Sequence, residues 1–131
     1  KGSSFYSVLI NGAQFNIQYD FSDKNGLYRI WINPVKIRQS RQYYDPLVPI
    51  IKRYLAEDFG EPAEVYDSND GSYFWVYQKE HTKAWFRYLD EGHILLFDVV
   101  IARNEFIEKK MMDMLGEDFY IREKEYIHRR N

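Results

Sequence analysis

Residues 73–101 decide the fold, and they read YFWVYQKEHTKAWFRYLDEGHILLFDVVI. Three runs rich in aromatic and β-branched side chains, residues 73–78, 83–89 and 93–101, are separated by short polar stretches. Runs of this composition that end in turn-forming residues are typical of β-strands. We therefore predict three antiparallel strands, joined by residues 79–82 and by a two-residue turn at Glu91-Gly92.

The two loops also set the register of these hairpins. The first loop pairs Tyr77 with Ala84, and the turn at Glu91-Gly92 pairs Phe86 with Phe97. Both faces of the sheet are then largely apolar, so the second face needs a cover, either the rest of the chain or a partner. That second face holds Phe74, Val76, Trp85, Arg87, Leu89, Ile94, Leu96 and Asp98.

The first third of the chain predicts three further strands. Residues 5–10 form a short apolar run, residues 15–21 alternate between apolar and polar side chains, and residues 27–32 resume the apolar pattern. Alternation with a period of two is typical of a strand with one buried face. Asn11-Gly12 and residues 23–26 are turn signals. We expect a three-stranded antiparallel meander.

Two helices complete the predicted fold. Asp45 is a suitable N-cap for a helix over residues 46–59, which Gly60 ends. A second helix is predicted over residues 105–115, with Asn104 as its cap and Gly116 as its end. The fold class is therefore α+β, an antiparallel meander sheet or sheets with two helices in the order β-β-β-α-β-β-β-α.

The 131 residues suffice for one domain. Residues 1–4, Lys-Gly-Ser-Ser, resemble a flexible linker, residues 5–116 form the single α+β domain, and residues 117–131 form a partly ordered tail. Linkers of this kind often follow a removed signal or a lipid-anchored segment. We therefore expect an extracytoplasmic location, in the periplasm or at the cell surface, with the cytoplasm as the alternative.

Composition excludes several classes of function. The chain has no cysteine, which excludes disulfides, thiolate zinc sites and cysteine nucleophiles. Its net charge of −2 gives no attraction for duplex DNA. His81, His93 and His128 are too widely spaced for a helical metal pair, and phosphate-binding and nucleophile-elbow motifs are absent. We predict no metal, no cofactor and no transmembrane segment.

The second sheet face supplies the first candidate site. Its members are large aromatic and aliphatic side chains together with one ion pair, Arg87 and Asp98, which the register places diagonally. An aspartate in such an apolar strand either orients a ligand or forms a structural pair or an edge-strand charge. The candidate binding residues are Phe74, Trp85, Arg87, Leu89, Leu96 and Asp98.

A basic, aromatic segment supplies the second candidate site. Cationic and aromatic side chains together bind single-stranded nucleic acid or an anionic glycan, although no RNA-recognition motif is present and a solvated loop is the simpler interpretation. The segment comprises Arg29, Trp31, Lys36, Arg38, Arg41, Tyr43 and Tyr44.

The sequence favours a binding domain over an enzyme, because 12 Tyr, 9 Phe and 3 Trp are abundant while catalytic motifs are missing. We expect a non-enzymatic, exported or surface-anchored bacterial protein whose aromatic-rich sheet face holds a protein or glycan partner, or a second copy in a homodimer. The alternative is a cytosolic interaction protein of the inhibitor or immunity type. A third hypothesis is a small enzyme that uses Asp98, Arg87 and a tyrosine.

Overall fold

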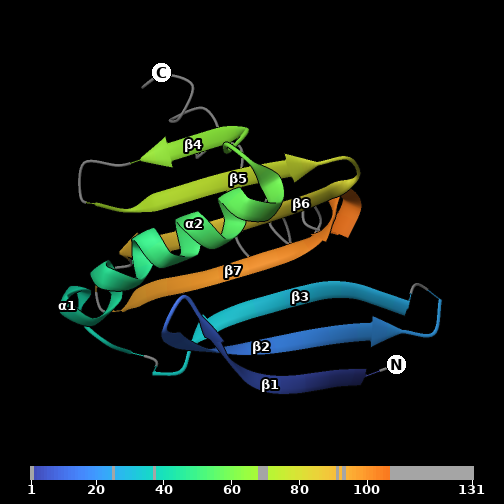
Figure 1. Cartoon of the computed structure of the whole chain (residues 1–131), viewed down its shortest axis with the longest axis horizontal. Helices are drawn as coiled ribbons and strands as arrows, with labels where there is room; N and C mark the ends of the chain where they lie inside the picture. Colours follow the sequence, from blue (N-terminus) through green and yellow to red (C-terminus); the bar gives the residue numbers. More distant parts are fainter. Residues whose placement is uncertain are drawn as a thin grey trace.

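The computed structural model describes residues 2–24, 26–36, 38–67, 71–90, 92 and 94–106. They form one seven-stranded sheet in the order β1-β2-β3-β7-β6-β5-β4, and all neighbouring strands are antiparallel (Figure 1). The strands are β1 (Gly2–Ile10), β2 (Ala13–Ser22), β3 (Gly26–Pro34), β4 (Glu64–Asp67), β5 (Tyr73–Lys79), β6 (Thr82–Asp90) and β7 (Leu95–Arg103).

The chain builds this sheet as two meanders from opposite edges. Strands β1 to β3 start at one edge, and a helical segment then carries the chain across to the other edge, where β4 begins. Strands β4 to β7 return toward the middle, where β7 pairs with β3. The α+β class and the antiparallel meander predicted from the sequence are confirmed.

Three predicted details need correction. Residues 2–4 are not a linker but the first residues of β1, because they pair with β2 and the Ser3 hydroxyl donates to Asp20 at 2.6 Å. Strand β4 was not expected, because its four residues carry too few apolar side chains to signal a strand. The β6–β7 loop spans four residues rather than two, since Asp90 pairs with Leu95.

The longer loop shifts the register of the second hairpin by two residues. Phe86 pairs with Val99 instead of Phe97, whereas the predicted pairing of Tyr77 with Ala84 is confirmed. A shift of two keeps every side chain on its face, because strand side chains alternate with a period of two. The predicted division of residues between the two faces therefore holds.

The helical segment begins earlier than predicted. It consists of α1 (Arg41–Tyr44), the 3-10 turn η1 (Asp45–Leu47) and α2 (Val48–Phe59), and it ends at Gly60 as expected. Asp45 is not an N-cap, because its backbone is already helical and its N–H donates to the carbonyl of Arg41. The Asp45 carboxylate instead accepts a hydrogen bond from the Tyr88 hydroxyl at 2.7 Å.

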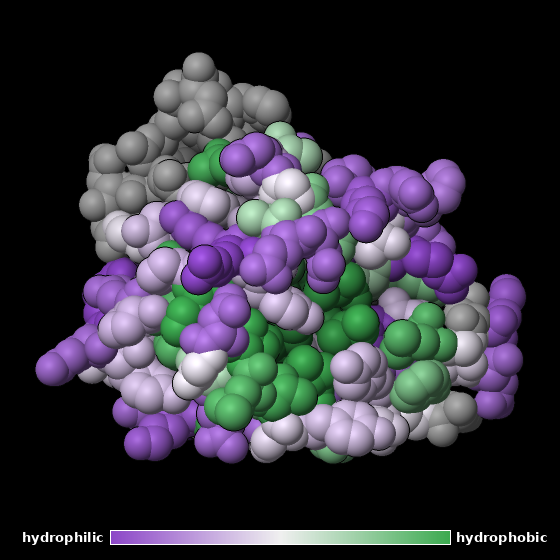
Figure 2. Space-filling view, in the orientation of Figure 1, coloured by the Kyte–Doolittle hydropathy of each residue, from purple (hydrophilic) through white to green (hydrophobic). Residues whose placement is uncertain are grey.

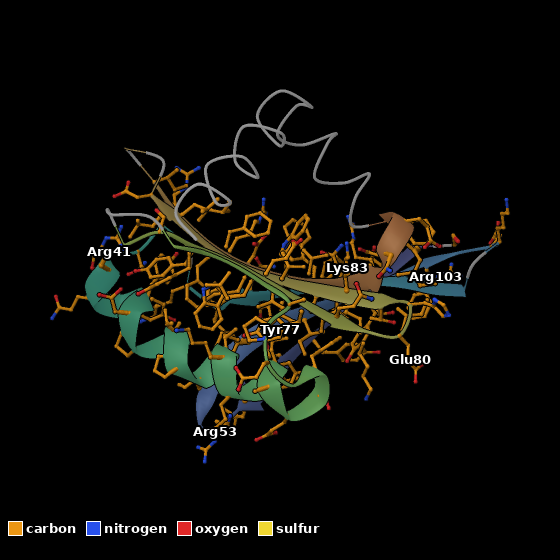
Figure 3. The ribbon with its side chains drawn as sticks, turned by 90° about the horizontal axis from the view of Figure 1, so that it is seen from above. Arg41, Arg53, Tyr77, Glu80, Lys83 and Arg103 are labelled. Atoms are coloured by element: carbon orange, nitrogen blue, oxygen red, sulfur yellow. The ribbon has the colours of Figure 1, made fainter. Side chains whose placement is uncertain are left out.

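Helix α2 covers one face of the sheet, and Tyr77 lies between the two (Figure 3). Ile51 and Leu55 of α2 are fully buried against aromatic residues of β2, β5, β6 and β7. The opposite face has a smaller buried cluster, against which the partly buried Trp31 and Phe106 pack. The members of this cluster are Phe74, Val76, Trp85, Val100 and Ala102.

Residues 104–106 are helical, which agrees with the start of the predicted second helix. The rest of that helix, residues 107–115, and the predicted tail, residues 117–131, lie outside the described residues. In the part of the chain that the structure describes, no helix is long and apolar enough to cross a membrane.

Candidate functional site

The first candidate site lies on the sheet face opposite α2, and its centre is an ion pair. Arg87 donates from Nε to Asp98 Oδ1 at 2.8 Å and from Nη2 to Asp98 Oδ2 at 2.6 Å. Trp31 Nε1 donates to Asp98 Oδ2 at 3.1 Å, and the Arg87 guanidinium lies 4.8 Å from the centre of the Trp85 ring. The two charged residues are directly opposite each other, not diagonal, because of the register shift.

This cluster is interior. Trp85 is fully buried, and the Arg87 and Asp98 side chains are each 1% exposed. Phe74 is also buried, whereas Leu89 and Leu96 are half-buried. In the structure, the face predicted to bind a partner is therefore covered, and the ion pair has the geometry of a structural pair, with both carboxylate oxygens already accepting hydrogen bonds.

Two donors in this interior lack an acceptor among the described residues: Trp85 Nε1 and Arg87 Nη1. They lie in neighbouring side chains, since the guanidinium stacks on the indole ring. An unpaired buried donor destabilises the folded state unless a water or another group satisfies it.

The second candidate site, the basic aromatic segment, does not form a single surface. Arg29 is bound to Asp20 through its Nε at 2.5 Å, and Trp31 is bound to Asp98. Tyr44 is 3% exposed and stacks on Phe97 with ring centres 5.4 Å apart. These three side chains are therefore engaged in contacts within the sheet and its helical cover.

The remaining four residues of the segment lie near the start of the helical region. Lys36 lies 5.9 Å from the ring centre of Tyr43. Arg38 has a left-handed backbone, with φ of 59°, and together with Arg41 it lines an open pocket of about 540 Å³. The other lining residues are Gln39, Ser40, Asp90, Gly92, Ile94 and Leu95.

Arg41 is held in place at the rim of this pocket. Its guanidinium lies 5.3 Å from the ring centre of Tyr88, with Nη2 3.4 Å from Asp90 Oδ2 and Nη1 3.5 Å from the carbonyl of Gly71. Burial, and then the hydrogen bond to Asp45, raise the pKa of Tyr88 well above its usual value. The tyrosine is therefore protonated at neutral pH and anchors the helical segment to the sheet.

The most exposed apolar surface lies on β1, at the edge of the sheet. Leu9 is 73%, Phe5 69% and Tyr6 55% exposed. Among the described residues, β1 pairs with a strand on one side only, and its nine residues include no charge and no proline. Figure 2 shows further apolar surface beside the hydrophilic outer side of α2, in the region of β1 to β3.

The sequence interpretation placed a strand at residues 5–10 but did not single it out as a site. The signal was present, because Phe5 and Leu9 have polar residues opposite them on β2, namely Gln18 and Gln14. On β2, these two side chains therefore have no aromatic or aliphatic residue directly opposite them. What the sequence alone did not provide was the edge position, which depends on the order of all seven strands.

Comparison with known proteins gives no relatives: no family model, no curated protein and no solved structure matches this chain. The described residues also contain no group of three or more histidine, aspartate or glutamate side chains arranged to hold a metal ion. The function must therefore be inferred from the surface of the molecule itself.

Proposed function

We propose that this chain is a non-enzymatic interaction domain that binds a protein partner by strand addition to the free edge of β1. The observation that carries the proposal is a nine-residue edge strand without charge or proline whose Phe5 and Leu9 side chains are mostly exposed. Edge strands of natural proteins are usually short, charged or covered, because an open edge pairs with other chains. In the part of the chain that the structure describes, β1 has none of these protections.

The opposite edge of the sheet provides the contrast. Strand β4 has four residues, and its sequence begins with Glu64 and ends with Asp67. Short length and flanking charges are the common means of protecting an edge. Since one edge of this sheet follows the rule and the other does not, the open β1 edge is consistent with a binding role.

The chemistry of the β1 edge favours a polypeptide over a glycan as the partner. A free strand edge offers a regular row of backbone N–H and C=O groups, which another extended chain matches with its own. The aromatic sheet face on which the sequence interpretation placed a glycan or protein is covered in the structure. An enzyme built on Asp98 would need that carboxylate to reach a substrate, but Asp98 is 1% exposed and already accepts three hydrogen bonds from Arg87 and Trp31.

A random peptide library tests this proposal with a defined probe. We expect selection at low protein concentration to enrich extended, uncharged peptides that contain β-branched or aromatic residues and no proline. The selected peptides should lose at least tenfold in affinity for Leu9→Lys, measured by fluorescence anisotropy, because the lysine places a charge on the edge where the peptide docks.

The matched control is Leu27→Lys, because Leu27 is also exposed, at 45%, but lies at the start of β3 and away from the β1 edge. This variant should bind the peptides as the wild type does. Failure to enrich such peptides, or equal binding by the wild type and Leu9→Lys, would show that the β1 edge is not a docking site.

A further inference from the structure

We infer that the strand that adds to β1 is β1 of a second copy of this chain, so that two seven-stranded sheets join across a two-fold axis. This inference rests on the proposed function and deepens it by naming the partner. Closed two-fold dimers are the commonest protein assemblies, and they require a surface that is complementary to itself. The composition and geometry of β1 meet that requirement.

The turn at the end of β1 identifies the residues that face the free edge. Asn11 and Gly12 form a two-residue loop with φ of 48° and 88°, and they join the pair Ile10 and Ala13. These angles are those of a type I′ turn, whose closing pair is hydrogen-bonded. Hydrogen-bonded and non-hydrogen-bonded pairs then alternate along the hairpin. The backbone groups of Phe5, Ser7 and Leu9 therefore point toward the free edge.

Two copies of β1 pair best in one antiparallel register, with Ser7 opposite Ser7 of the second copy. This register places Phe5 opposite Leu9 of the second copy, and it does so twice because of the two-fold symmetry. In this register, the edge-facing backbone groups of one copy lie opposite the edge-facing backbone groups of the other, so that they can form the hydrogen bonds of an antiparallel pair. The most exposed apolar side chains of the strand, 69% and 73% exposed, would then cover each other.

The neighbouring register is less favourable. When Tyr6 lies opposite Tyr6 of the second copy, Phe5 faces Ser7 and Leu9 faces Ser3. More backbone pairs form, but the large apolar side chains remain next to small polar ones. Cross-strand pairs of apolar side chains are what stabilise one register over another, so the Ser7-centred register is the one that we assign.

The absence of charge on β1 also favours a second copy over a different protein. Complementary charges are the usual means by which a surface selects one partner and rejects others. Residues 2–10 carry no charged side chain, so β1 neither repels its own copy nor attracts an oppositely charged partner.

Sedimentation of the full chain tests the inference. We expect the wild type between 1 and 200 µM, a range chosen for the experiment, to contain a species of twice the 15.9 kDa chain mass. Leu9→Lys should raise the dimer dissociation constant at least tenfold, whereas Leu27→Lys should leave it unchanged. Circular dichroism and the melting temperature check that both variants fold. A wild type that stays monomeric at 200 µM, or a dimer insensitive to Leu9→Lys, overturns the inference.

Disulfide formation tests the register, because the chain has no cysteine of its own. Ser7→Cys should form a covalent dimer on mild oxidation, since the two residues lie opposite each other across the axis, within the reach of a disulfide. Ser4→Cys is the matched control: its two copies lie about 20 Å apart at roughly 3.4 Å per residue and should not form one. Equal crosslinking of both variants, or of neither, contradicts the register.

The outcomes separate this inference from the proposed function. A monomeric chain that still binds selected peptides at β1 retains strand addition as the function and removes the second copy as the partner. A monomeric chain that binds no peptide removes both. A dimer that responds to Leu9→Lys and crosslinks through Ser7→Cys supports both.

Discussion

The ion pair between Arg87 and Asp98 shows how single residues serve this fold. Both side chains lie in the interior, and the carboxylate accepts three hydrogen bonds, two from Arg87 and one from Trp31. Removing charges from water is unfavourable, and good geometry with additional donors offsets that loss. Each member of the pair therefore depends on the other to remain buried as a charge.

Removal of one member of this pair should be strongly destabilising. Asp98→Asn leaves the buried Arg87 charge without its counter-ion, and we expect it to lower the free energy of unfolding by about 3 to 5 kcal/mol. The double variant Arg87→Met with Asp98→Leu should recover most of that loss, because it removes both buried charges. Urea denaturation of the three proteins checks this. A small effect of Asp98→Asn would show that the Arg87 charge is already compensated otherwise.

Asp20 should make the stability of the protein depend on pH. Burial raises the pKa of Asp20, but hydrogen bonds from Gln18, Ser3 and Arg29 lower it more, so its value lies below the usual one. A carboxylate with a lowered pKa in the folded state adds stability above its unfolded pKa, and the gain disappears as the pH falls through the folded value. Asp20→Asn should therefore be less stable than the wild type at pH 7, and the difference should shrink below about pH 4.

The measurement is the free energy of unfolding of both proteins from pH 7 to pH 3. Glu57→Gln on the exposed side of α2 is the control, and its difference from the wild type should stay small throughout. A difference between the wild type and Asp20→Asn that does not change with pH would mean that the hydrogen bonds at Asp20 do not depend on its charge.

At the scale of elements, helix α2 stabilises one sheet face through few, fully buried side chains. Leu55→Ala should lower the free energy of unfolding by about 2 to 5 kcal/mol, because Leu55 is 0% exposed and its removal leaves a cavity. Arg53→Ala, on the exposed side of the same helix (Figure 3), should change it by less than about 0.5 kcal/mol. Thermal and urea unfolding check both. Similar losses in the two variants would mean that helix propensity, and not packing, dominates.

The elements that could be predicted from the sequence are those with strong local signals. Strands β5, β6 and β7 and the meander of β1 to β3 follow from alternation and turn residues. The second hairpin was misjudged because β7 begins only at Leu95, so that Asp90 pairs with Leu95 across a longer loop, in which the Asp90 carboxylate accepts from the N–H of Gly92 at 2.9 Å. Strand β4 depends on pairing with β5, which local composition does not reveal.

At the scale of the whole molecule, the sequence indicated candidate residues but not where they lie. It identified Trp85, Arg87 and Asp98 as one group, and the structure brings them together, but in the interior. It did not identify the β1 edge, because an edge exists only once the order of all strands is known. Exposure and strand order are non-local properties, and they decide which aromatic residues are available for binding.

The pairing of β3 with β7 has a consequence for how the chain folds. These strands meet over four residue pairs, and the hydrogen bond from Trp31 to Asp98 joins residues 67 positions apart. Contacts so distant along the chain form slowly, whereas each meander is closed by short loops. We expect the two meanders to form first as separate ribbons. Until they join, the inner edges of β3 and β7 are open and apolar, and we expect the chain to be most prone to aggregation at that stage.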